Sequence, residues 1–61
     1  MAYLERRSSA ELVCFLEMCM QQDYWNQYAQ TVPQVFAILQ DRNIPVAKTI
    51  QDSWQAFIHN I

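Results

Sequence analysis

Glycine is absent from this sequence of 61 residues, and proline occurs only twice. Glycine is the residue that positive-φ turns and tight β-hairpins most often require. Its absence therefore argues against a fold rich in β-structure. It also makes Asn43 the best candidate for a left-handed turn, because asparagine tolerates that conformation better than most residues do.

Cations are scarce as well. Lys and Arg together number four, and the net charge is −2. Proteins that bind nucleic acid neutralise phosphates with clustered Lys and Arg side chains, and this chain has few of them. The composition therefore argues against a nucleic acid partner.

Long apolar runs are also missing. The longest run of large apolar residues, 12–16, is far shorter than the roughly 20 residues that a membrane-spanning helix needs. Arg6 and Arg7 precede an apolar segment, as in a signal peptide, but Glu11 and Glu17 interrupt that segment and no small-residue cleavage pattern follows. We expect a cytoplasmic protein with no membrane partner.

The apolar residues that are present recur at the spacing of amphipathic helices, which predicts an all-α fold. We expect a small bundle of three main helices, at about 9–22, 32–42 and 45–60, with a short helical turn at about 24–30. Residues 1–61 are interpreted as a single helical domain in which 1–7 form a short N-terminal lead-in.

Three polar positions indicate where these helices begin. Ser8 and Glu11 have the Ser-x-x-Glu spacing of a capping box, in which each side chain satisfies a backbone N–H of the first turn. Thr31 and Gln34 repeat that spacing before the second main helix. Asp23 is interpreted as the N-cap of the short helical turn that follows it.

Each main helix carries one apolar face, and together these faces predict the core. The face of the first helix consists of Leu12, Val13, Phe15, Leu16, Cys19 and Met20. The face of the second consists of Val32, Val35, Phe36 and Leu39. The face of the last consists of Val46, Ile50, Trp54, Phe57 and Ile61, flanked by Ile58.

No residue pattern indicates catalysis, a cofactor or a metal. Cys14 and Cys19 lie about 140° apart around one predicted helix, so they cannot pair with each other without unwinding it. His59 is the only histidine, and zinc requires three or four ligands at workable spacing. We expect a protein with no catalytic residue, no bound cofactor and no metal site. We expect two reduced thiols, with an intermolecular disulfide through Cys14 as the alternative.

Apolar residues nevertheless make up 52% of a chain that can bury only a small core. Some of these side chains should therefore lie at the surface or in an interface. The predicted partner-binding residues are Met18, Tyr24, Trp25 and Tyr28, because Tyr, Trp and Met are enriched in interfaces. The alternative is that the aromatic segment with Tyr24, Trp25 and Tyr28 covers the end of the small core. Trp25 fits none of the three apolar faces, so we predict that it is partly exposed in an isolated protomer.

The first functional hypothesis is a small protein–protein interaction module, not an enzyme. It would act as an adaptor, inhibitor or regulatory factor on a protein partner, as a homodimer that covers its surplus apolar surface. A related possibility is that the chain is one subunit of a permanent complex and folds poorly alone.

The alternative hypothesis is a helix-turn-helix transcriptional regulator that binds DNA. The segment around residues 43–45 would be the turn, and Lys48, Gln51 and Gln55 on the last helix would contact DNA. Asp52 on the same face and the net negative charge weigh against this reading.

Overall fold

A computed structural model describes residues 2–60, with the side chains of residues 4–60. Within that part of the chain there are four helices and no strand: α1 (Ala2–Glu5), α2 (Ser9–Gln22), α3 (Val32–Asp41) and α4 (Lys48–His59). The predicted all-α bundle of three main helices is therefore confirmed. The additional short helix, α1, lies in the segment that was expected to be a lead-in.

The helix α2 begins where the capping box predicts. The Ser8 side chain accepts a hydrogen bond from the Glu11 backbone N–H at 3.1 Å, and the Glu11 carboxylate accepts one from the Ser8 backbone N–H at 3.1 Å. These reciprocal bonds satisfy two N–H groups that have no partner within the helix. The predicted start of α2 is confirmed.

The end of α2 differs from the expectation. Asp23 adopts a left-handed conformation with φ 57° and caps the C-terminus of α2, so the prediction that it is an N-cap was wrong. Residues 25–31 then form consecutive turns, and together with Tyr24 they make up the turn segment 24–31. One of them, closed by the Tyr28 N–H and the Tyr24 carbonyl oxygen at 3.1 Å, has the hydrogen-bond spacing of an α-helix. The segment changes the direction of the chain between α2 and α3.

The helix α3 starts without the capping box that was predicted for it. Thr31 has helical backbone angles and makes no capping hydrogen bond through its side chain, and the Gln34 amide donates instead to the Gln30 carbonyl oxygen. At its C-terminus, Asn43 has φ 60°, as predicted from the absence of glycine. The Ile44 N–H donates to the Leu39 carbonyl oxygen at 2.9 Å, which completes a Schellman-type C-cap.

The helix α4 begins at Lys48, three residues later than the predicted start at 45. The segment 44–47 is not helical, in keeping with the restriction that Pro45 places on the residue before it. Ala47 is the N-cap, and its carbonyl oxygen accepts a hydrogen bond of the first turn from the Gln51 N–H at 3.1 Å. The Gln51 side-chain amide donates to the Val46 carbonyl oxygen at 2.7 Å and so ties the first turn of α4 to this linker.

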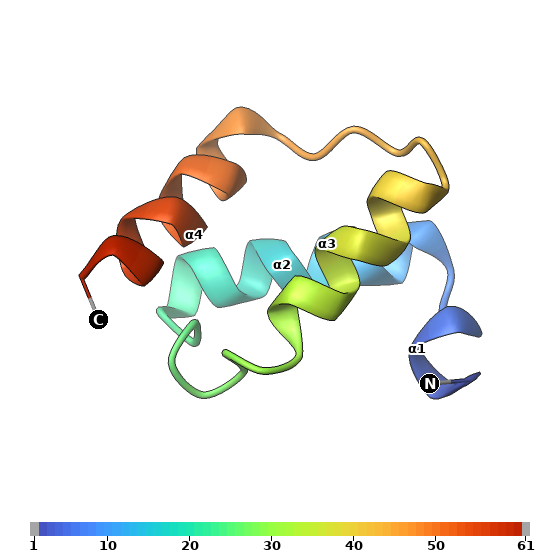
Figure 1. Ribbon diagram of the computed structural model, residues 1–61, viewed down its shortest axis with the longest axis horizontal. Coiled ribbons are helices and arrows are strands. Elements are labelled where there is room, and N and C mark those ends of the chain that lie inside the picture. Colours follow the sequence, from blue (N-terminus) through green and yellow to red (C-terminus); the bar gives the residue numbers. More distant parts are fainter. Residues whose placement is uncertain (1, 61) are drawn as a thin grey trace.

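The central element is α2, which packs against both α3 and α4 (Figure 1). The core is entirely apolar, and no buried residue in the described part of the chain is polar or charged. Its buried residues are Leu12, Leu16, Cys19, Trp25, Val32, Val35, Leu39 and Ile50. The predicted core faces are thus confirmed in part. Leu12, Leu16 and Cys19 of α2, Val32, Val35 and Leu39 of α3, and Ile50 of α4 are buried. The other predicted residues of these helices are only half-buried and pack against that core: Val13, Phe15 and Met20 of α2, Phe36 of α3, and Trp54 and Phe57 of α4. Ile61 lies outside the described residues.

A long-range polar contact joins the N-terminal segment to the end of α3. The Arg42 guanidinium donates to the Glu5 carbonyl oxygen at 2.7 Å, to the Arg7 carbonyl oxygen at 2.9 Å and to the Ser9 hydroxyl at 3.2 Å. These bonds fix the segment between α1 and α2 against the rest of the protein. No local sequence pattern indicates them, because the partners lie at least 33 residues apart.

Candidate protein-binding groove

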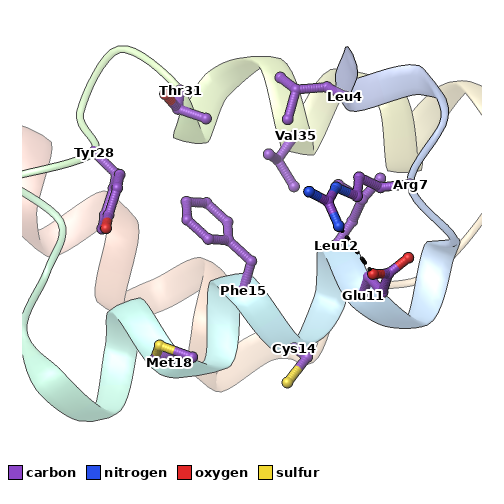
Figure 2. Close-up of a pocket in the computed structure, with 10 residues that line it drawn as sticks. All are labelled: Leu4, Arg7, Glu11, Leu12, Cys14, Phe15, Met18, Tyr28, Thr31 and Val35. Carbon is purple, nitrogen blue, oxygen red and sulfur yellow. Dashed lines mark hydrogen bonds and ion pairs between the residues drawn. The ribbon is translucent and has the colours of Figure 1, made fainter. Parts of the chain in front are cut away.

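An open groove of about 480 Å³ lies between α2, the N-terminal segment and the beginning of α3 (Figure 2). Its apolar lining consists of Leu4, Leu12, Phe15, Met18, Tyr28 and Val35. Its polar lining consists of Arg7, Glu11, Cys14 and Thr31. We call this feature the groove. Its size and apolar lining suit one or two large apolar side chains.

Edge-to-face aromatic contacts shape one end of the groove. The rings of Phe15 and Tyr28 are 5.2 Å apart between centroids at 74°, and those of Tyr24 and Tyr28 are 6.2 Å apart at 72°. Such edge-to-face geometry is favourable for aromatic pairs. Phe15 projects from α2 toward Tyr28 and Thr31 (Figure 2). The turn segment 24–31 is therefore linked to α2 through these rings.

Three of the four predicted partner-binding residues lie at this end. Met18 is 50% exposed and lines the groove, Tyr28 is half-buried and lines it, and Tyr24 is 37% exposed and contacts Tyr28. Met18 and Tyr24 are the two exposed large apolar residues of the described side chains. The structure thus brings together Met18, Tyr24 and Tyr28.

The fourth predicted partner-binding residue, Trp25, does not lie on the surface. It is only 2% exposed, so the prediction that it is partly exposed was wrong. Its indole N–H donates to the Ser53 hydroxyl at 2.8 Å, and its ring lies 5.4 Å from that of Trp54. Trp25 points toward α4 and belongs to the core because α4 covers it, an arrangement that no pattern within 24–30 could reveal.

A charged pair borders the other end of the groove. The Arg7 guanidinium lies 3.2 Å from the Glu11 carboxylate, on side chains that are both well exposed (Figure 2). The pKa of Glu11 is lowered, mainly by the hydrogen bond from the Ser8 backbone N–H and further by the Ser8 hydroxyl and Arg7. Glu11 therefore stays ionised at neutral pH and contributes both to the helix cap and to the groove's edge.

The sequence did not identify four of the six apolar residues of the groove as binding residues. Two of the four, Leu12 and Val35, were assigned to the core and are buried there. Phe15 was assigned to the core face of α2, but it lies at the edge of that face and is half-buried. Leu4 was assigned to the lead-in, but it packs against the core and forms part of the groove wall. The position of Phe15 at the border of the apolar face of α2 could have indicated that it is partly exposed. No sequence pattern indicated that Leu4 lines the groove.

The two cysteines differ in environment. Cys14 is exposed on the edge of the groove, and Cys19 is buried in the core. Burial raises the pKa of the Cys19 thiol, which keeps it protonated and poorly reactive. Among residues 2–60, no group of three or more His, Cys, Asp and Glu side chains could hold a metal ion.

The residues predicted to contact DNA lie on exposed positions of α4. The Lys48 ammonium lies 3.1 Å from the Asp52 carboxylate, so its charge is partly offset. The Gln51 side-chain amide donates a hydrogen bond to the Val46 carbonyl oxygen. Gln55 is exposed. The structure offers no observation that favours DNA binding over the protein-binding hypothesis.

No helix in the described residues combines the length and apolar character needed to cross a lipid bilayer. Comparison of the chain with protein families, curated proteins and solved structures found no match.

Proposed function

We propose that this chain is a small non-enzymatic protein–protein interaction module that binds an apolar segment of a protein partner in the groove. In this role it acts as an adaptor, inhibitor or regulatory factor by covering a surface of that partner. The observation that carries the proposal is the half-exposed Met18 beside Phe15 and Tyr28 on an apolar groove.

The chemistry of these side chains supports a protein partner. Methionine adapts its shape to different apolar surfaces, and tyrosine presents a ring together with a polar hydroxyl group. A partner that covers Met18, Tyr24 and Phe15 would remove apolar surface from water. Each Å² of apolar surface buried in this way contributes about 25 cal/mol of favourable free energy. Polar groups at the edge, among them Thr31 and Glu11, would orient the bound segment.

Self-association as a homodimer is the second part of the proposal. Phe36, Trp54 and Phe57 form a separate aromatic cluster with centroid separations of 5.5 and 6.3 Å, and all three are half-buried. We place the homodimer contact on this cluster, so that the groove remains free for the partner. Sedimentation velocity at micromolar concentration should show a dimer, and a strict monomer would contradict this part.

Site-specific photo-crosslinking tests the groove. A benzophenone amino acid at Met18 should crosslink to a discrete protein in cells that make this chain, because Met18 would contact the partner directly. The matched control places the same amino acid at Gln55, which is exposed on α4 away from the groove lining, and it should give no such product.

The crosslinked partner then permits a measurement of affinity. Met18→Ala should weaken binding of that partner by about fivefold to tenfold, or ~1 kcal/mol, because it removes an apolar contact without disturbing the core. Gln55→Ala should leave the affinity unchanged. Equal crosslinking at both positions, or equal affinity of both variants, would contradict the proposal.

A further inference from the structure

We propose that residues 2–7, which we call the strap, form a displaceable cover over one end of the groove, held closed by Arg42. In the closed state the Leu4 side chain lies in the position that an apolar side chain of a partner would take. This inference rests on the proposed function, since it supplies a regulation for the same groove.

The position of Leu4 is the first observation. Leu4 is half-buried, packs against the core and lines the groove with Val35 (Figure 2). It comes from α1, whereas the lining opposite it comes from α2 and α3. A segment from the N-terminus of the same chain thus supplies one wall of the groove.

The attachment of the strap is the second observation. Arg42 donates to the carbonyl oxygens of Glu5 and Arg7 at 2.7 and 2.9 Å, and these lie at the end of α1 and just before α2. Its bond to the Ser9 hydroxyl at 3.2 Å fixes the guanidinium over the first turn of α2. A single side chain thereby holds the strap at two backbone positions.

The weakness of the strap on its own is the third observation. A helix of four residues, such as α1, is not stable in water without tertiary contacts. Glu5, Arg6 and Arg7 are exposed, and the ion pair between Arg7 and Glu11 is of the solvent-exposed kind that contributes little. The strap is therefore the type of segment that opens locally while the rest of the protein stays folded.

These observations define a competition. An apolar side chain of a partner that entered this end of the groove would displace Leu4, and the apparent affinity would be reduced by the fraction of molecules in which the strap is closed. Removing the Arg42 hydrogen bonds would increase the open fraction and raise the affinity of the groove.

Limited trypsin digestion of the whole chain tests the opening. Arg42→Met keeps a long, unbranched side chain but removes the guanidinium group and all its hydrogen-bond donors. It should speed cleavage after Arg7 by at least about fivefold, because cleavage follows the population of the open strap. Cleavage after Lys48, at the start of α4, serves as a reference within the same molecule and should not change.

Arg42→Lys, which keeps the charge and a donor group, should give a cleavage rate after Arg7 between those of the wild type and Arg42→Met. An unchanged rate after Arg7 in Arg42→Met would overturn the inference. A parallel increase after Arg7 and Lys48 would also overturn it, because Arg42 would then stabilise the whole fold and not the strap.

Binding of Nile red, an uncharged apolar dye, tests whether the strap covers the groove. Arg42→Met should bind the dye about threefold to tenfold more tightly than the wild type. Faster cleavage after Arg7 with unchanged dye affinity would overturn the covering role. Failure of the crosslinking at Met18 would instead count against the proposed function alone, since neither the digestion nor the dye depends on a protein partner.

Discussion

The indole N–H of Trp25 donates a hydrogen bond to the Ser53 hydroxyl, with 2.8 Å between the nitrogen and oxygen atoms. It joins the turn segment 24–31 to α4 across 28 residues of sequence. Because Trp25 is 2% exposed, its N–H has exchanged water for this single protein acceptor. Loss of the acceptor would leave a buried donor without a partner.

Ser53→Ala should therefore lower the free energy of unfolding by about 1–2 kcal/mol, the cost of an unsatisfied buried donor. Urea denaturation followed by tryptophan fluorescence measures this change. Gln55→Ala on the exposed side of α4 is the control and should leave the midpoint unchanged. Equal midpoints for both variants would show that the Trp25 N–H regains water without cost.

Trp25→Ala should unfold much of the protein. Truncation of a buried tryptophan costs about 3–5 kcal/mol, whereas a chain of this length has about 3–9 kcal/mol of total stability. The far-ultraviolet circular dichroism signal and the thermal midpoint should both fall. Tyr24→Ala, a change at an exposed aromatic neighbour, should retain the helical signal. A fully helical Trp25→Ala variant would contradict the assignment of Trp25 to the core.

The capping box should make the stability of α2 depend on pH. The pKa of Glu11 is lower in the folded state, so its contribution is present above the pKa of the unfolded chain and is lost as the pH falls through the folded pKa. Between about pH 7 and about pH 3, the thermal midpoint of the wild type should fall more than that of Glu11→Gln. Glu17→Gln, at an exposed position of α2, should keep the wild-type dependence on pH.

The two thiols should differ sharply in reactivity. In the native protein one thiol, Cys14, should react quickly with Ellman's reagent at neutral pH, because it is exposed. Cys19 should react only as fast as the protein unfolds, because it is buried and its pKa is raised. Cys14→Ser should abolish the fast phase, and both thiols of the wild type should react in denaturant. Two fast thiols in the native state would contradict the core described above.

The parts of the fold that depend on neighbours in sequence could be predicted. The start of α2 follows from Ser8 and Glu11, its buried face follows from the spacing of the apolar residues, and the left-handed turn at Asn43 follows from the lack of glycine. Each of these features is determined within one or two helical turns.

The parts that depend on distant contacts could not be predicted. Trp25 is buried because α4 supplies Ser53 and Trp54, and the strap is held because Arg42, the C-cap of α3, lies beside it. The delayed start of α4 and the capping of α2 by Asp23 also depart from the local pattern. The candidate site was predicted in part for the same reason. Exposed Met18 and Tyr24 were identified, whereas Leu4 enters the groove only through tertiary structure.

The left-handed turns at Asp23 and Asn43 affect the unfolded chain as well as the folded one. A residue with a side chain is strained by about 1–2 kcal/mol in this conformation, less for Asp and Asn, whose side chains bond locally. In return, a polymer without glycine samples fewer backbone states when denatured and so gains less entropy on unfolding. Replacing either residue with glycine would relieve the strain in the folded state but raise the conformational entropy of the unfolded chain. Because these two effects oppose each other, the net change in melting temperature should be small.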